Sequence, residues 1–345
     1  MSAVSFNTPS FDLSSWRDAA KALQHQIGSI ILGQERAIEF ITIAIFARGH
    51  VLLEGDVGTG KTTLLRAFSH AIGGAFERIE GTSDLMPSDL IYNSYLNAQG
   101  QPRVDPGPLL RHGETLSIFF FNEINRARPQ VHAMLLRLMA ERSLFAFDRD
   151  YSFPFVQVFA DRNRVEREET FELPAAARDR FFMEVHIEAP EDPEIRRQLI
   201  FDTRFHDTDR LIESTRAATV DYRLLDDVAR AIQDQVYTSP TLQHYVVTLW
   251  DALTRPADHG IEIENVDMER LVQGGGSPRG LAFLVKAARV RAFLQGRDIL
   301  LPEDIREVFF ETVGHRVFFD PIYEMRQENL SRALCRAVLA TVPAP

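Results

Sequence analysis

Short apolar runs alternate with helical apolar patterns along the first half of the chain. Runs of strand length begin near residues 51, 76, 116, 155 and 183, and apolar residues recur at helical spacing between several of them. The run from Leu116 to Phe121 is almost continuously apolar, which is typical of a strand covered on both faces in a parallel sheet. The pattern therefore predicts an α/β fold with a parallel five-stranded sheet.

Beyond Pro190 only helical patterns remain, over residues 193–201, 224–236, 241–253 and 281–294. We therefore divide the chain into an N-terminal arm and helix (1–29), an α/β nucleotide-binding core (30–189) and an all-α domain (190–345). Two turn-rich segments inside the core, near 90–110 and 143–153, predict inserted hairpins.

The segment from Gly55 to Thr62 reads G-x-x-x-x-G-K-T and lies between the apolar run at 51–53 and a helical pattern. A strand, a glycine-rich loop and a helix in this order form a phosphate-binding loop, in which backbone N–H groups surround phosphate oxygens. Lys61 would reach the β- and γ-phosphates, and the Thr62 hydroxyl would bind Mg²⁺. We expect ATP and Mg²⁺ to bind here, through Gly55, Asp56, Val57, Gly58, Thr59, Gly60, Lys61, Thr62 and Thr63.

The composition of the 345 residues narrows the class of protein. A single cysteine excludes a disulfide framework and a cysteine-built zinc site. The N-terminus lacks a secretory pattern and the apolar runs are too short to span a bilayer, so we expect a cytoplasmic protein without membrane insertion. A net charge of −11 argues against a generic nucleic-acid binder, because such proteins neutralise phosphates with cations.

Polar residues with candidate catalytic roles follow two of the buried runs. Glu123 lies at the strand end where open α/β sheets bind ligands, and its carboxylate could polarise the attacking water. Asn122 stands where an aspartate normally helps to hold Mg²⁺. It keeps a carbonyl oxygen but lacks the charge, so we expect weaker metal binding or slow turnover. Asn163, beyond the run at 155–160, is a candidate for binding the γ-phosphate or orienting the water.

Three arginines complete the candidate catalytic site. Arg178 and Arg180 precede the last strand-like run, and Arg279 opens a long helical pattern in the second domain. An arginine supplied by a neighbouring subunit can stabilise the charge that spreads over the γ-phosphoryl oxygens. From its place in the sequence, Arg279 could reach over a nucleotide held between the two domains.

A small apolar patch, Ile31 and Leu32, lies ahead of the predicted phosphate-binding loop. Such a patch is well placed to hold an adenine ring. Simple packing is an equally good interpretation, and the sequence leaves both open.

Taken together, these motifs resemble those of the MoxR family of AAA+ ATPases, from about Ile30 to the end of the chain's helical domain. The matching segments are Ile31-Leu32-Gly33-Gln34, the P-loop with the strand before it, Asp105-Pro106-Gly107-Pro108-Leu109, Asn122-Glu123-Ile124-Asn125-Arg126-Ala127, Asp179-Arg180-Phe181 and Ser277-Pro278-Arg279. The resemblance implies a Walker A motif with Lys61 and Thr62, a Walker B motif with Asn122 and Glu123, sensor 1 at Asn163, an arginine finger at Arg180 and sensor 2 at Arg279. It also implies a helical lid and a hexameric ring with ATP at the subunit boundaries, with the hairpins facing the pore or a partner.

The chain departs from the family pattern near two of these positions. The family's usual Ala-Thr-Gln-Asn-Pro at sensor 1 is Ala160-Asp161-Arg162-Asn163-Arg164 here. Arg178 takes a place that an apolar residue usually holds, so it could share the finger role.

The resemblance also implies a chaperone that acts with a protein carrying a von Willebrand factor A domain, often in metal or cofactor insertion. Residues 119–123 and 159–163 look most like the MoxR branch of methanol-oxidation gene clusters, which is associated with maturation of the calcium- and quinone-dependent methanol dehydrogenase. We therefore expect an ATP-dependent remodeller of methanol dehydrogenase or its assembly factors. Two alternatives stay open: an ATP-binding scaffold that scarcely hydrolyses because of Asn122, and a nucleic-acid motor, which the acidic charge disfavours.

Overall fold

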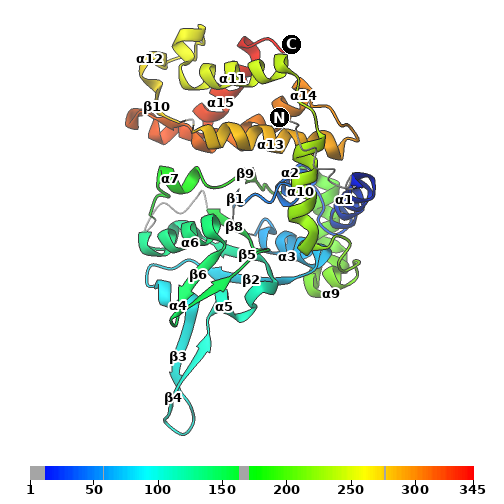
Figure 1. The fold of residues 1–345 in the computed structure, drawn as a ribbon, viewed down its shortest axis with the longest axis vertical. Coiled ribbons are helices and arrows are strands. Elements are labelled where there is room, and N and C mark those ends of the chain that lie inside the picture. Colours follow the sequence, from blue (N-terminus) through cyan, green and yellow to red (C-terminus); the bar gives the residue numbers. More distant parts are fainter. Residues whose placement is uncertain (1–11, 57, 163–170, 276) are drawn as a thin grey trace, which may run out of the picture.

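A parallel sheet of five strands lies at the centre of the molecule (Figure 1). The computed structural model describes residues 12–56, 58–162, 171–275 and 277–345. The order across the sheet is β2-β5-β8-β1-β9. These strands are β2 (Ala75–Glu80), β5 (Leu116–Asn122), β8 (Gln157–Arg162), β1 (Val51–Glu54) and β9 (Met183–His186). The predicted parallel five-stranded sheet is confirmed.

Successive strand residues point to opposite faces of the sheet, and each face has its own apolar core. Val51, Phe120 and Phe159 belong to the core beneath the first helices of the chain. These helices are α1 (Leu13–Gly28), α2 (Glu35–Phe46) and α3 (Lys61–Ile72). Leu52 and Phe121 belong to the other core, which α6 (Pro129–Glu141) covers. Burial on both faces explains why the central strands are almost wholly apolar.

Both predicted hairpins are present. The first joins β3 (Tyr92–Leu96) to β4 (Pro102–Pro106) and is flanked by α4 (Pro87–Ile91) and α5 (Pro108–Arg111). It extends away from the core, on the side opposite the C-terminal helices (Figure 1). The second joins β6 (Ser143–Ala146) to β7 (Arg149–Ser152), and both residues of its turn, Phe147 and Asp148, have positive φ.

The helices after residue 190 divide into two groups. In the first, α8 (Pro193–Phe201) is followed by α9 (Thr208–Glu213) and α10 (Leu225–Gln235). α9 contacts α3, and α10 contacts α1 and α2, so this stretch lies against the core. The second group forms the lid (Figure 1): α11 (Pro240–Thr254), α12 (Met268–Leu271), α13 (Pro278–Leu294), α14 (Pro302–Val313) and α15 (Gln327–Thr341). Within the described ranges, none of these helices combines the length and apolar character that crossing a bilayer requires.

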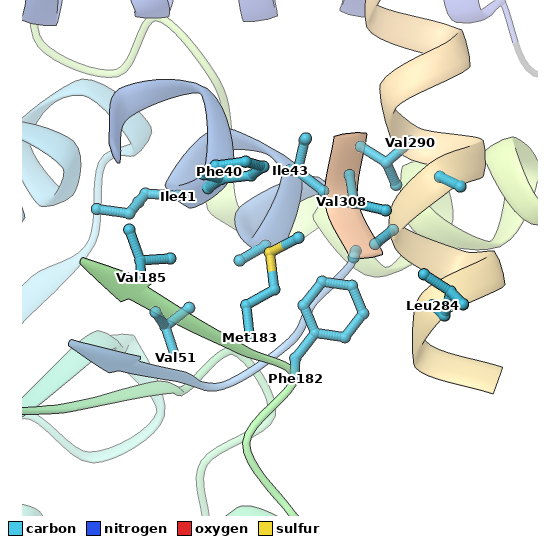
Figure 2. Packing of buried hydrophobic residues seen from close by; sticks show 14 of the residues in the cluster. Phe40, Ile41, Ile43, Val51, Phe182, Met183, Val185, Leu284, Val290 and Val308 are labelled. Atoms are coloured by element: carbon cyan, nitrogen blue, oxygen red, sulfur yellow. The ribbon is translucent and has the colours of Figure 1, made fainter. Parts of the chain in front are cut away.

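The lid shares an apolar core with the sheet. Figure 2 shows Phe40 of α2 and Met183 of β9 close to Leu284 of α13 and Val308 of α14. Phe182 packs edge-on against Phe283 of α13, with ring centroids 5.3 Å apart. These side chains therefore form one continuous apolar contact between the core and the lid.

Asp179 forms the polar part of this contact. Its carboxylate accepts hydrogen bonds from Ser277 Oγ and Arg279 Nη1, both at 2.8 Å, and pairs with Arg316 Nε at 3.3 Å. Arg316 is only 1% exposed and also donates to the backbone carbonyl of Phe181. A buried charge without a partner would cost several kcal/mol, so this network fixes the start of α13 beside Asp179.

His50 is buried at the start of β1 in its neutral form. Its Nδ1 accepts a hydrogen bond from the Val158 N–H at 2.9 Å, and its Nε2 lies 3.0 Å from the Met139 carbonyl, to which it donates. Burial lowers the pKa of His50 to about 3, although the Met139 carbonyl favours the protonated form. The folded chain therefore resists protonation of this ring.

We predict that acid weakens the fold through His50. The folded pKa of about 3 lies below the ordinary value of 6.5, so in this window only the unfolded chain binds the proton. The contribution of His50 to stability is therefore fully present above pH 6.5, and it falls by about 1.4 kcal/mol for each pH unit towards pH 3. Urea unfolding at pH 7.0, 6.0 and 5.0 should show a steeper loss for the wild type than for His50→Gln. Equal pH slopes for the two proteins would contradict the assignment.

Candidate functional site

The loop between β1 and α3 forms an open cradle for phosphate. A Cβ at Gly55 would lie 2.1 Å from the Ile187 carbonyl, so only glycine allows this close passage beside β9. Gly58 and Gly60 have φ of +82° and +86°, and nothing described lies within 4 Å of a Cβ built at either position. No described side chain caps the N-terminus of α3, which leaves its first N–H groups for a ligand.

Lys61, the first residue of α3, lies folded into this loop. Its ammonium donates to the carbonyl of Gly55 at 2.6 Å and lies 3.4 Å from the carbonyl of Asp56. It also forms an ion pair with Asp161 Oδ2 at 2.8 Å. The Lys61 side chain is 9% exposed, so water screens this pair only weakly.

Asp161 is the partner that sequence reasoning missed. It lies near the end of β8, with a side chain only 1% exposed. Burial raises the pKa of its carboxyl, and the hydrogen bond from Lys61 and the backbone N–H of Glu123 oppose that rise. Its departure from the family pattern was visible in the sequence, but its contact with Lys61 required the fold.

The Asn122–Glu123 turn lies at the C-terminal end of β5, and the P-loop follows the C-terminal end of β1 on the same side of the sheet. Glu123 has a φ of +54°, a left-handed conformation that is costly for a residue with a side chain. Its N–H donates to Asp161 Oδ1, and its Oε2 accepts from Arg126 Nη1 at 2.9 Å. Asn122 is buried, and its Nδ2 donates to Glu80 Oε1 at 2.6 Å. The structure therefore brings Glu123, Asn122 and Lys61 together at the C-terminal ends of the strands.

These residues fit a nucleotide and its metal ion. The open loop and the uncapped α3 N-terminus suit phosphate oxygens, and Lys61 adds a positive charge beside them. Thr62, in the first turn of α3, and Asn122 offer the hard oxygen ligands that Mg²⁺ prefers. The bond to Glu80 uses the amide nitrogen of Asn122, and no described residue donates to the side-chain oxygen, which is left for that role.

Ile31 and Leu32 lie on the same edge of the sheet. The adjoining Gln34 donates to the backbone carbonyl of Glu188, just after β9, at 2.6 Å. Both apolar side chains are partly exposed, and Ile31 packs against the main core. This position is compatible with either interpretation, an adenine contact or packing.

Val57 of the loop and Asn163, the expected sensor 1, lie outside the described residues, so their predicted roles stay predictions.

Arg180 and Arg279 lie at the N-terminal ends of the strands, whereas the P-loop lies at the C-terminal ends. They line a cavity of about 380 Å³ together with Gly49 and His50, which precede β1, and Phe182, which precedes β9. Arg48, Arg142 and Lys286 line it as well, so five cations face this space. Arg178 is directed elsewhere: its guanidinium lies over the Phe318 ring of the lid, 4.5 Å from the centroid.

The expectation that Arg279 reaches over a nucleotide between the two domains of its own chain is not met. The hydrogen bonds of Ser277 and Arg279 to Asp179 hold the start of α13 near the N-terminal ends of the strands. The P-loop follows the C-terminal end of β1, which is about 13 Å further along a four-residue strand. Arg279 therefore does not lie over the P-loop of its own chain in this structure.

A second polar cluster lies beside the P-loop. Arg162 donates to Glu54 Oε2 at 2.8 Å and to Glu184, and the two carboxylates raise its pKa against the effect of burial. Glu54, Glu184 and His186 have ligand atoms close enough to hold a metal ion. Burial raises the pKa of Glu184 to about 8, and Arg162 is paired with both Glu54 and Glu184, so we assign this cluster a structural role.

Comparisons with known proteins agree with this geometry. The model of the ATPase family associated with various cellular activities (AAA) matches residues 50–183, and an AAA lid domain matches residues 267–333. Protein MoxR of Methylorubrum extorquens is 63% identical over 96% of this chain and 97% of its own length. Chaperone MoxR1 of Mycobacterium tuberculosis is 31% identical over 93% of this chain and 81% of its own length. A crystal structure from Cytophaga hutchinsonii, assigned as an ATPase, superimposes with a TM-score of 0.81 at 29% identity and covers 96% of each chain.

We predict that Gly81→Ala damages turnover more than nucleotide binding. The Gly81 N–H donates to the Asn122 carbonyl at 2.7 Å, and a Cβ at this position would lie 2.2 Å from the Glu123 carbonyl. The added methyl group must displace the Glu123 turn, and such displacements lower kcat by about tenfold to a hundredfold. The three atoms nearest the added Cβ belong to Asn122 and Glu123 and none to the P-loop, so the affinity for a fluorescent ATP analogue should change less than about threefold.

Gly28→Ala is the matched control, because nothing lies within 4 Å of its added Cβ. Steady-state ATP hydrolysis and analogue binding should both match the wild type in this control. Unchanged kcat in Gly81→Ala would show that the turn tolerates displacement.

Proposed function

Because the chain belongs to the MoxR family of AAA+ ATPases, we propose that it works as a ring of identical subunits that hydrolyse ATP at their boundaries to remodel a partner protein. The separation of the P-loop from Arg180 and Arg279 carries this proposal. One chain holds the two halves of the site at opposite edges of its sheet. Head-to-tail contact between copies would bring the halves together, and repeated contact of this kind forms a ring when the rotation between neighbours closes. We infer a hexamer, as the family resemblance implies.

Each chain's residues have separate roles in this mechanism. The P-loop amides and Lys61 would bind the phosphates, and the Glu123 carboxylate would accept a proton from the attacking water. Mg²⁺ bound with the nucleotide would neutralise charge on the phosphates. Arg180 of the adjoining subunit would stabilise charge on the γ-phosphoryl oxygens, with Arg279 beside it. Glu123 is paired with Arg126 in the chain alone, so the carboxylate must exchange this partner for water.

The hairpins offer a surface for a partner protein. Leu96 is 69% exposed and Val104 57% on the first hairpin, while Phe145 and Phe147 are more than half exposed on the second. Apolar side chains exposed on projecting hairpins are typical of protein contacts. Chaperone MoxR1 is named for such a role, and we propose the same class of function here. From the resemblance we infer a partner with a von Willebrand factor A domain, and methanol dehydrogenase or its assembly factors as the client.

One observation favours a second function. Asn122 lacks the charge of the usual aspartate, and its amide is bonded to Glu80. A ring with such a site could bind ATP and hold partners together while hydrolysing little. The net charge of −11 argues against the third candidate, a nucleic-acid motor.

We predict that two inactive variants restore activity when mixed. Glu123→Gln should remove the water-polarising carboxylate, and Arg180→Ala should lower kcat about a thousandfold if it is the arginine finger. In a mixed ring, the P-loop side of an Arg180→Ala subunit would meet the intact arginine of a Glu123→Gln neighbour. Random mixing at equal amounts makes roughly a quarter of the boundaries complete. Steady-state ATP turnover, measured over a protein concentration series, should rise accordingly.

Mixtures that stay inactive would contradict sites shared between subunits. The same experiment with Arg178→Ala shows which arginine acts across the boundary, because only that variant should be rescued. Wild-type turnover no higher than that of Glu123→Gln, with ATP still bound, would favour the scaffold.

We predict that the first hairpin is needed for action on a client but not for hydrolysis. Leu96→Ser with Val104→Ser removes exposed apolar area distant from the P-loop, so basal ATP turnover should stay within about twofold of wild type. ATP-dependent recovery of activity by calcium-depleted methanol dehydrogenase should fall to the level seen with Glu123→Gln. Ile322→Ser is the control, because Ile322 is 72% exposed but lies in the lid. Equal recovery with the hairpin variant and wild type would remove the hairpin from the client surface.

A further inference from the structure

Three polar side chains form a row across the ends of neighbouring strands. Glu80 of β2 is paired in register with Asn122 of β5. Phe121 is paired with Ala160, so the residues that follow them, Asn122 and Asp161, lie next to each other. Residues in register on parallel strands point to the same face, and the strands are about 4.8 Å apart. The row therefore runs carboxylate, amide, carboxylate.

The amide in the middle makes this row stable. Asn122 Nδ2 donates to Glu80 Oε1 at 2.6 Å, which a carboxylate in its place could not do. An aspartate here would put three carboxylates side by side on adjacent strands, and like charges in such positions repel. Glu80 is exposed and is paired with the exposed Arg78, so water screens its part of this repulsion, and the main repulsion comes from the buried Asp161.

Asp161 connects the P-loop to the turn at Glu123. One oxygen of its buried carboxylate lies 2.8 Å from Lys61 Nζ, and the other accepts from the N–H of Glu123. This places a single negative charge in contact with both the P-loop lysine and the catalytic turn. A charge-assisted hydrogen bond in a dry site orients its partners strongly.

We propose that Asp161 supplies, from β8, the carboxylate that the chain lacks at Asn122, and that it is a positioning residue acting through Lys61 and the Glu123 turn. Compared with the usual arrangement, the negative charge lies one strand further along the sheet: it is carried by Asp161 of β8, while residue 122 of β5 is a neutral asparagine. The inference rests on the ATPase activity of the family and is independent of the proposed ring and client. One consequence is that Asn122→Asp, which restores the usual aspartate, harms the site because its new charge lies between Glu80 and Asp161.

A four-protein cycle tests the pair: wild type, Asp161→Asn, Asn122→Asp and the double variant. The first readout is the affinity for a fluorescent ATP analogue over a Mg²⁺ titration, and the second is the split between kcat and KM for ATP. We expect each single variant to lower Mg²⁺-dependent affinity and kcat by about tenfold. The double variant moves the charge back to β5 and should recover to within about threefold of wild type.

Asp304→Asn is the matched control for loss of a buried carboxylate. Asp304 is fully buried in the lid and pairs with Arg291 and Arg297, so its variant should melt at a lower temperature with unchanged nucleotide affinity. Melting temperatures without nucleotide are measured for every protein, which separates loss of fold from loss of positioning.

The proposal is wrong if Asp161→Asn keeps wild-type affinity and kcat, or if the double variant is no better than Asp161→Asn. A rise in kcat for Asn122→Asp would also overturn it, and that test stands even if Asp161→Asn does not fold. If wild-type hydrolysis equals that of Glu123→Gln, hydrolysis itself has failed, and the Mg²⁺ dependence of binding still decides the role of Asp161.

Discussion

The carboxylate of Asp179 determines how the two parts of the chain fit together. It accepts hydrogen bonds from Ser277 and Arg279 at the start of the lid's long helix, and it pairs with the buried Arg316. The apolar core beneath α13 and α14 would permit sliding, because packing contacts have little directional preference. The polar network gives the lid one position. That position places Arg279 beside Arg180 and away from its own P-loop, and the inference of sites shared between subunits depends on it.

At the C-terminal ends of the strands, the carboxylate of Asp161 likewise holds separate segments together. It joins three segments that are distant in the sequence: the P-loop, the end of β5 and the end of β8. Asp161 and Asp179 each lie near the end of a strand. Asp161 is paired with Lys61 of α3, and Asp179 is paired with Arg279 of α13. The molecule thus keeps two groups of residues apart. The P-loop lies at the C-terminal ends of the strands, and the five cations that line the cavity lie at the N-terminal ends.

Much of the fold and of the candidate site could be predicted from the sequence, because the patterns that identify their elements lie within short segments of the chain. Apolar runs predicted the five strands, the glycine spacing predicted the phosphate-binding loop, and turn residues predicted both hairpins. The position of Arg279 could not be predicted, since it depends on Asp179, which lies 100 residues away in the sequence. The role of Asp161 was hidden for the same reason. Its identity stood out as a departure, but its partner Lys61 is near only after β8 pairs with β1.

The separation of the two edges has a genetic consequence. In the ring that we propose, a chain that lost its arginines at the N-terminal strand ends would keep an intact P-loop and could still take its place between two neighbours. It would then silence the active site of the neighbour that relies on it, although that neighbour carries no defect. A damaged gene copy would therefore be dominant over a normal one in the same cell, whereas a deletion of the gene would be recessive.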